Sequence, residues 1–321
     1  MRNYWLLLLL VLPLNAHVLL AQRAGTPSFQ VVPLGVKGGL DESNLSAYML
    51  APANSNNYIC LDAGTLRTGI RQAVTNKVFR ATTDEVLKKY IKGYLISHAH
   101  LDHLAGLIIN STDDSTKIIY ALPDCIEQIQ KNYFNWQSWP NFGNTGAGLA
   151  LKKYAYKPLN ANGAETAIQN TDLQVQAFPL SHGDAYQSAA FLIRNKEDYV
   201  LYLGDTGPDA VEKKQNLQNI WQKISPLVKA NKLKGIFIEV SYPDEQPDKL
   251  LFGHLTPHWL MREMETLHSF TGKGNLNSLN VIITHIKPAD KDEEKVKAQL
   301  KAQNKLKLNL IFPEQGKAFS L

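Results

Sequence analysis

The sequence GYLISHAHLDH, residues 93–103, joins a short apolar strand to a dense group of ionisable side chains. Residues 93–97 have the pattern of a buried strand, and His98 and His100 follow it. Side chains alternate between the two faces of an extended chain, so these two histidines point to the same side. Neutral imidazole is a common ligand of Zn²⁺ and related divalent ions. The end of this strand is therefore a candidate metal site.

Asp102 and His103 complete this group where the chain turns into a predicted helix. Four imidazole or carboxylate groups then converge at the end of one strand. One tetrahedral ion cannot easily use all four from so short a stretch, whereas two adjacent ions can. The spacing thus favours a binuclear centre, which needs further ligands from elsewhere in the chain.

Three further candidate ligands each follow a predicted apolar strand. They are His182, Asp205 and His285. Active sites of α/β proteins are placed at such strand ends, on the loops that leave a sheet. A lone histidine there would more often be a satisfied polar residue of the surface or the core. The combination of all these groups instead indicates one shared site.

The rest of the chain alternates strands with helices and contains no repeat. Strands are predicted at 29–35, 45–50, 58–61, 93–97, 118–121, 173–180, 189–194, 199–203, 235–240, 280–284 and 308–312. Helices are predicted at 82–92, where Thr82 and Glu85 form a capping box, and at 124–134, 211–231 with a break at Pro226, 257–267 and 291–303. This order is typical of a layered α/β protein, with sheets packed between helices.

The composition is that of an ordinary globular protein, with 44% of the 321 residues hydrophobic and 20% charged. The formal net charge of +5 comes from scattered lysines and arginines, so no nucleic-acid partner is expected. Two cysteines are too few for a zinc ribbon, an iron–sulfur cluster or a disulfide-rich scaffold. Cys60 and Cys125 could form one disulfide or be two buried thiols.

Residues 1–21 (MRNYWLLLLLVLPLNAHVLLA) have the form of a signal peptide. Arg2 precedes an apolar stretch from Trp5 to Leu14, which is shorter than the about 20 residues of a spanning helix. Cleavage after Ala21 would leave residues 22–321 as a single soluble domain, periplasmic or secreted, without a stable membrane anchor. The alternative is a segment that stays attached as an anchor. The oligomeric state is left open.

The run from His98 to His103 resembles the HxHxDH signature of the metallo-β-lactamase superfamily. Continued to Leu107, it resembles the signature of class II cyclic-nucleotide phosphodiesterases. Other segments similar to that family are LDAGT at 61–65, LSHG at 180–183, LGDT at 203–206, IEVS at 238–241 and GHLTP at 253–257. The later segments also resemble the tRNA 3′-processing endonucleases. The resemblance implies a four-layer αββα sandwich of the metallo-β-lactamase type.

The resemblance divides the ligands between two divalent metal ions. One ion would be held by His98, His100 and His182. The other would be held by Asp102, His103 and His285, with Asp205 bridging the two. Asp62 would orient a ligand histidine through its other ring nitrogen, unless it is a turn residue that satisfies its own backbone. Zinc is the expected metal, with manganese or iron as alternatives.

The charge of such a site suits an anionic phosphodiester. Two divalent ions, the carboxylates of Asp102 and Asp205 and a bridging hydroxide leave a net charge of about +1. Bound metal lowers the pKa of water toward about 7, so hydroxide is available at neutral pH. The sugar alkoxide that leaves still needs a proton, and His254, held by Glu239, is the candidate donor. The candidate catalytic residues are therefore His254, Glu239 and Asp102.

The expected function is hydrolysis of 3′,5′-cyclic nucleotides, with cAMP first, to nucleoside 5′-monophosphates by a hydroxide that bridges the two metal ions. Alternatives are another hydrolase of this fold (a general phosphodiesterase, a lactonase or an RNA-processing nuclease) and a non-catalytic metal-binding module. Five aromatic residues at 133–142 could stack on bases, although packing against the core is the favoured interpretation. His258 and His268 are expected at the surface of a helix.

Overall fold

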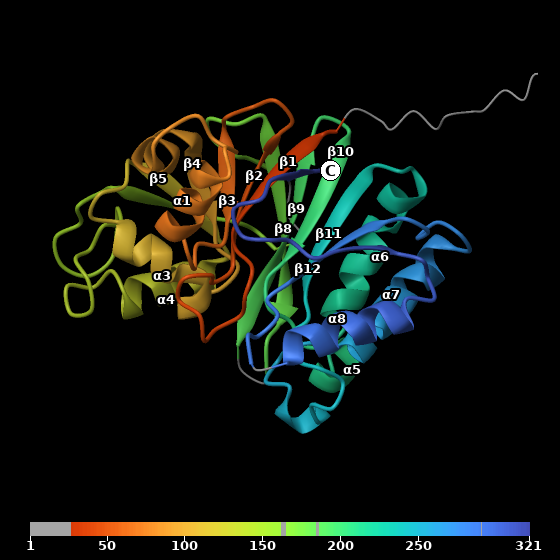
Figure 1. Cartoon of the computed structure of the whole chain (residues 1–321). Helices are drawn as coiled ribbons and strands as arrows, with labels where there is room; N and C mark the ends of the chain where they lie inside the picture. The colour runs from red at the N-terminus through yellow and green to blue at the C-terminus, as the bar shows by residue number, and fades with distance from the viewer. Residues whose placement is uncertain (1–26, 162–164, 184–185, 290) are drawn as a thin grey trace, which may run out of the picture.

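The computed structural model describes residues 27–161, 165–183, 186–289 and 291–321, which form two facing sheets of seven strands each (Figure 1). The first sheet has the order β14 (Phe319–Ser320), β1 (Phe29–Gly35), β2 (Ala47–Pro52), β3 (Tyr58–Leu61), β4 (Ile91–Leu95), β5 (Lys117–Ala121) and β6 (Tyr154–Pro158). The second has the order β13 (Asn309–Ile311), β12 (Asn280–Thr284), β11 (Leu233–Glu239), β10 (Asp198–Leu203), β9 (Gln187–Asn195), β8 (Leu173–Ser181) and β7 (Thr166–Ala167). The predicted signal peptide, residues 1–21, lies outside the described residues.

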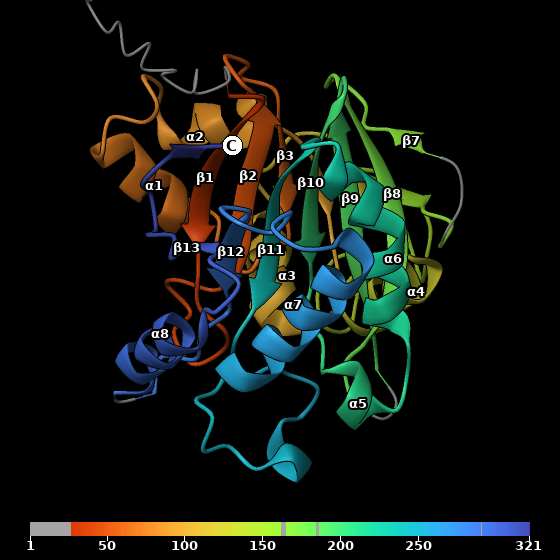
Figure 2. The same cartoon turned by 90° about the vertical axis from the view of Figure 1, so that its right-hand side faces the viewer.

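Helices cover the outer face of each sheet (Figures 1 and 2). On the first sheet they are α1 (Arg67–Thr75), α2 (Thr83–Glu85), the π-helix η1 (Val86–Tyr90), α3 (Leu101–Asn110) and α4 (Pro123–Asn132). On the second they are α6 (Asn216–Lys229), α7 (Pro257–Thr271) and α8 (Asp292–Gln303). The short α5 (Asp209–Glu212) and the 3-10 helix η2 (Asp248–Leu250) lie in loops of the second half. The result is the expected four-layer αββα sandwich.

Alternating side chains explain why the two sheets stack. Along β2, Met49 joins the core formed with the helices, whereas Tyr48 and Leu50 join the core between the sheets. The Tyr48 ring meets Phe237 of the second sheet edge-on, with centroids 5.5 Å apart. Each sheet therefore buries both faces, and its strands are apolar on both sides.

Each predicted strand overlaps a strand of the structure, whereas β6, β7 and β14 are not predicted. The sequence also gives no signal for α1, which carries Gly69 in its interior. A Cβ on Gly69 would lie 2.0 Å from the backbone oxygen of Leu34, so this glycine lets α1 pack directly on β1. The helix expected to reach Lys92 ends at Tyr90, because Ile91 is already extended and paired in β4.

The predicted helix over 211–231 is wrong in two respects. It is interrupted after α5, because Lys213 ends that helix in the left-handed region with φ of 53°. Pro226 does not break α6. The carbonyl of Gln222, which a proline at this position leaves without its N–H donor, accepts a hydrogen bond of 3.0 Å from the Ser225 hydroxyl instead.

Both cysteines are buried free thiols, which settles the open alternative against a disulfide. The aromatic segment at 133–142 largely packs against the core, as favoured: Phe134 and Phe142 are buried and Tyr133 and Trp139 lie against them. Trp136 is exposed, and its indole donates to a backbone oxygen. No helix in the described ranges combines the length and apolar character needed to cross a bilayer.

Candidate active site

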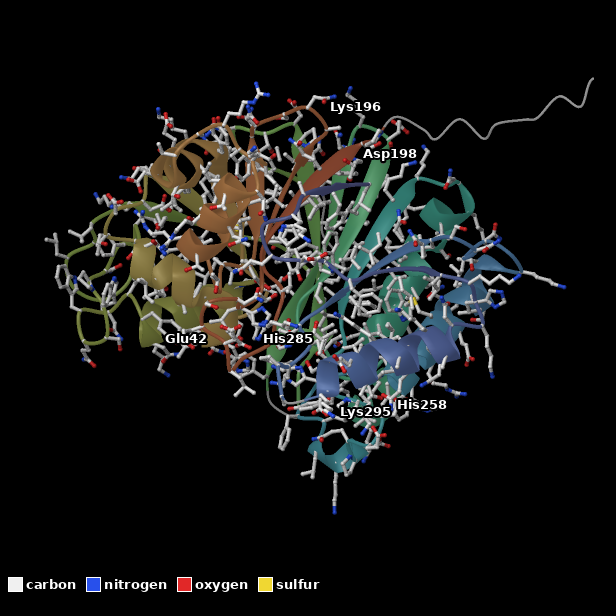
Figure 3. All side chains as sticks on the ribbon, in the orientation of Figure 1. Glu42, Lys196, Asp198, His258, His285 and Lys295 are labelled. Carbon is white, nitrogen blue, oxygen red and sulfur yellow. The ribbon has the colours of Figure 1, made fainter. Side chains whose placement is uncertain are left out.

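The candidate site lies where parallel strands of both sheets end. In the first sheet β3, β4 and β5 run parallel, and in the second β10, β11 and β12 do. Their carboxyl ends therefore meet at one end of the molecule, where His285 is seen between the two sheets, opposite Lys196 and Asp198 (Figure 3). The chain leaves β3 at Asp62, β4 toward the 98–103 cluster and β12 toward His285.

Three histidines form the first group of the site. His100 Nδ1 lies 3.1 Å from His98 Nε2 and 3.2 Å from His182 Nε2. The three nitrogens come from the loop after β4 and the end of β8. Nitrogen lone pairs at this separation converge on one point, as in a three-histidine metal site. The structure thus brings together the three residues assigned to the first ion.

Two carboxylates and two histidines form the second group. His285 Nε2 lies 3.1 Å from Asp102 Oδ2 and 3.2 Å from Asp205 Oδ2. His103 Nε2 lies 3.2 Å from the same oxygen of Asp205. One potential ligand atom from each of the four residues lies within 4.8 Å of the others. This is the set assigned to the second ion.

Asp205 Oδ2 stands between the two groups. Besides its neighbours in the second group, it lies 3.8 Å from both His98 Nε2 and His182 Nε2. Asp205 is 2% exposed at the end of β10. A single buried oxygen that faces ligands of both groups has the position of a bridging ligand.

The second ring nitrogen of most of these histidines is held by an oxygen. The contacts are His98 Nδ1 to Ser97 Oγ (3.0 Å), His103 Nδ1 to Asp62 Oδ2 (2.7 Å), His182 Nδ1 to the oxygen of Gly253 (2.9 Å) and His285 Nδ1 to Ser241 Oγ (2.9 Å). Such partners fix the ring orientation and leave Nε2 unprotonated toward the centre. Asp62 makes the contact that the resemblance implies.

The polar atoms of the centre fit a cation. Within the described part of the chain, His103 Nε2 and Asp205 Oδ2 are buried and have no hydrogen-bond partner. Orphaned buried polar atoms are costly, and a divalent ion would satisfy both at once. The cluster of histidines and aspartates is therefore compatible with divalent metal binding.

The electrostatics differ between the two groups. Burial, followed by the neighbouring His182, lowers the pKa of His100 to about 4, so its imidazole is in the neutral form that ligates metals. Burial alone would also lower the pKa of His103. The surrounding carboxylates, Asp205 first, outweigh burial and raise it well above its usual value. The carboxylates thus favour positive charge in the second group, which a divalent ion would supply in place of the His103 proton.

His254 lies beside the centre and is paired with a carboxylate. Its Nδ1 lies 2.8 Å from Glu239 Oε1, and the other oxygen of Glu239 accepts a hydrogen bond of 2.7 Å from the Ser241 hydroxyl. Burial alone would lower the pKa of His254, but Glu239 reverses this and the net shift is upward. His254 also lies within ligand distance of His182 and Asp205. Geometry therefore admits it as a proton donor or as a ligand.

The sequence analysis missed several residues that hold the site in place. Gly38 passes so close to the His285 ring that a Cβ would lie 2.3 Å from it, and the N–H of Gly39 donates to Asp102 Oδ2 at 3.0 Å. Gly253 has φ of +77°, and a Cβ there would lie 2.2 Å from the nitrogen of Gly183. The pair Gly38-Gly39 is visible in the sequence, but nothing there relates it to His285 or Asp102.

Half-buried tyrosines lie beside the site. The Tyr186 ring stacks on His100 with centroids 4.2 Å apart, and Tyr242 lies 5.7 Å from His254. Tyr133 donates from its hydroxyl to the backbone oxygen of Ala99. His258 is exposed and His268 half-buried on α7, both outside this cluster.

A two-sheet αββα sandwich with histidines and aspartates gathered at its strand ends defines a protein of the metallo-β-lactamase fold with a candidate metal centre. The unliganded crystal structure of yeast PDE1 matches with a TM-score of 0.82 and 24% identity, covering 92% of this chain and 100% of that one. YhfI from Bacillus subtilis, described as a metallo-β-lactamase fold protein, matches with a TM-score of 0.59 and 16% identity, over 91% and 99% of the two chains. These likenesses confirm the predicted fold.

The family is identified by sequence. Residues 29–316 match the family described as cAMP phosphodiesterases class-II. A relative from Aliivibrio fischeri named 3′,5′-cyclic-nucleotide phosphodiesterase is 46% identical over 308 residues, which cover 91% of this chain and 93% of the relative. The chain belongs to the class II cAMP phosphodiesterase family. The predicted family and enzyme class are thereby confirmed.

Proposed function

We propose that this enzyme hydrolyses 3′,5′-cyclic nucleotides, cAMP among them, to nucleoside 5′-monophosphates at the site formed by both sheets. One observation carries the proposal: a buried His254–Glu239 pair, joined at 2.8 Å, lies beside the two ligand groups that share Asp205 Oδ2. The sugar alkoxide that leaves a phosphodiester is a poor leaving group, so a residue that can protonate it is expected beside the metal-ligand groups.

The ligand groups are proposed to hold two divalent ions, zinc first, with manganese or iron as alternatives. One set is His98, His100 and His182, the other is Asp102, His103 and His285, and Asp205 serves both. When bound, the ions supply a low-pKa water and stabilise negative charge on phosphate oxygens.

The His254–Glu239 pair supplies the proton for the leaving group. Because the Glu239 carboxylate accepts at Nδ1, this nitrogen keeps its proton, and Nε2 is the atom that can donate to the substrate. Donation to O3′ as the phosphorus–oxygen bond breaks converts the departing alkoxide to a hydroxyl. Ser241 donates to the second Glu239 oxygen and keeps the carboxylate in place.

The test compares two substrates that differ in their leaving group. In the variant His254→Ala, we expect kcat for cAMP to fall by about 10²–10⁴-fold, the usual contribution of a general acid. With bis(p-nitrophenyl) phosphate the fall should be much smaller, because p-nitrophenolate leaves without a proton. The matched control is His258→Ala, which removes an exposed histidine of α7. Wild-type rates on cAMP, cGMP and the nitrophenyl ester separate a cyclic-nucleotide enzyme from a general diesterase.

Metal analysis of the same variants completes this test. His254→Ala should keep the wild-type metal content, so a loss of metal would instead make His254 a ligand. An equal loss of rate on both substrates would contradict the role of proton donor. Wild-type protein that leaves cAMP intact would overturn the proposed function.

We further propose that the enzyme is exported, with residues 1–21 as its signal peptide. The support is the short apolar stretch behind Arg2. Mass spectrometry of the secreted or periplasmic protein should show a chain that lacks these residues.

A further inference from the structure

A half-buried lysine lies beside the candidate site and its proton-donor pair. Lys287 follows His285 by two residues, and its backbone N–H donates to the oxygen of Ser241 at 3.3 Å. Its ammonium lies 5.5 Å from the centre of the Tyr242 ring. The centre of the Tyr242 ring in turn lies 5.7 Å from the centre of the His254 ring. The lysine thus lies on the loop that carries the candidate ligand His285, and it contacts the segment after β11 that carries the candidate acid His254.

The ammonium also faces the second ligand group. A Cβ placed on Gly39 would lie 3.9 Å from Asp102 Oδ2 and 4.0 Å from Lys287 Nζ, so both charged groups lie close to this glycine. Within the described residues, no carboxylate lies within salt-bridge distance of Lys287. A half-buried ammonium without a direct carboxylate partner is available to an anion.

We propose that Lys287 binds the phosphate of the nucleotide and that Tyr242 positions its ammonium. The inference rests on the proposed function and names a residue that contributes to substrate and product binding. A cation within about 6 Å of an aromatic ring is attracted to its face, which restrains an otherwise flexible side chain. The cyclic substrate carries one negative charge, and the 5′-monophosphate product carries close to two. Lys287 therefore acts on product affinity at least as strongly as on substrate affinity.

Steady-state kinetics with cAMP test this role. In Lys287→Met we expect KM to rise about tenfold, the size of one lost charge-assisted contact, and kcat to fall by less than about threefold. Inhibition by 5′-AMP should weaken by at least the same factor. Lys287→Arg should recover most of the binding, because it keeps the charge. The control is Lys273→Met, an exposed lysine beyond the far end of α7.

A double-mutant cycle tests the positioning by Tyr242. Tyr242→Leu should raise KM by a smaller factor than Lys287→Met, and the two changes together should be no worse than Lys287→Met alone. Additive effects would show that Tyr242 does not act through the lysine.

Two measurements besides activity distinguish the possible failures. Calorimetric binding of 5′-AMP to the metal-loaded protein should weaken in Lys287→Met, whereas metal content should stay at the wild-type value. Unchanged nucleotide affinity would overturn the inference even with an active wild-type enzyme, and a changed metal content would show that Lys287 acts on the ligand groups rather than on the nucleotide. Wild-type protein inactive on cAMP would instead overturn the proposed function.

Discussion

Asp62 and Asp114 are buried carboxylates of the first sheet, with similar surroundings and different partners. Both are at most 5% exposed, and both accept hydrogen bonds from tyrosine hydroxyls. Asp62 follows β3, whereas Asp114 precedes β5. Because β3, β4 and β5 are parallel, the two residues lie at opposite ends of the sheet.

The network of Asp114 is closed by a cation. It accepts from Tyr94 at 2.7 Å and Tyr154 at 2.9 Å, and it forms a buried ion pair with Lys117. All of these partners belong to β4, β5 and β6. The negative charge is compensated on the spot, so the group has nothing left to bind.

The network of Asp62 stays open. It accepts from Ser97 Oγ at 2.8 Å, from Tyr202 at 2.6 Å and from His103 Nδ1 at 2.7 Å. Beyond His103 the network reaches Asp205 Oδ2, and the facing nitrogen and oxygen are both without a hydrogen-bond partner among the described residues. A buried carboxylate compensated by lysine stabilises the fold. A buried carboxylate whose hydrogen-bond network ends on atoms without a partner instead indicates a binding site for an external cation.

The largest expected effect is at the closed network. Asp114→Asn leaves the Lys117 ammonium buried without a counter-charge, and breaking such a pair costs about 3–5 kcal/mol of unfolding free energy. Denaturant unfolding of the metal-free protein measures this loss. Asp114→Asn combined with Lys117→Met should recover much of the stability. The folded single variant should bind metal like the wild type, so a loss of metal affinity there would remove the contrast between the two networks.

A smaller effect is expected in the Asp62 network, where the substitution changes the free energy of metal binding. Asp62→Asn places an amide against His103, and an N–H facing Nδ1 favours the tautomer with its proton on Nε2, which cannot ligate. Metal affinity should fall by about 10–100-fold, as measured by chelator competition at fixed pH.

The matched control for that variant is Tyr202→Phe. It removes one hydrogen bond to Asp62 and should cost about 1 kcal/mol of stability with little change in metal affinity. Equal metal affinity in Asp62→Asn and the wild type would contradict the distinction between the open and closed networks.

The ligands could be predicted from the sequence because their chemistry is concentrated in few residue types. Residues 98–103 contain three histidines and one aspartate, which is an unusual concentration of ligand groups. Asp205 and His285 follow apolar strands that are themselves recognisable. Short apolar runs likewise predict most of the strands, whereas the four-layer arrangement is implied by the resemblance. Composition and order within short segments are sufficient for such features.

The supports of the site could not be predicted, because they depend on contacts between distant segments. Ser241 joins Glu239 to His285 only because β11 and β12 are neighbours. Gly253 matters because its backbone meets His182, which lies 71 positions away. Asp62 is an exception, because the resemblance implies its contact with a ligand histidine, whereas nothing in the sequence relates Asp114 to Tyr94 and Tyr154 of other strands.

The smallest effect is expected at Glu263 of α7. This residue is a third buried carboxylate, and its partners differ from those of Asp62 and Asp114. It accepts from the Trp221 indole at 2.9 Å and from the backbone N–H of Asp209 at 3.2 Å, and it forms no ion pair with a lysine or a histidine of the described residues. Burial raises its pKa above the usual 4.5. The folded protein therefore holds this proton more tightly than the unfolded chain does, and the unfolding free energy falls as pH rises from the unfolded to the folded pKa.

Glu263→Gln removes that ionisation and should change the pH dependence of stability. The stability of the variant relative to the wild type should increase from pH 4 to pH 7, by no more than a few degrees in Tm, with the gain complete above the folded pKa. Thermal unfolding of the metal-free proteins across this range checks it. A relative stability that stays constant or declines with pH would show that Glu263 is ionised at no cost. It would then resemble Asp114, with a compensating charge supplied from elsewhere in the fold.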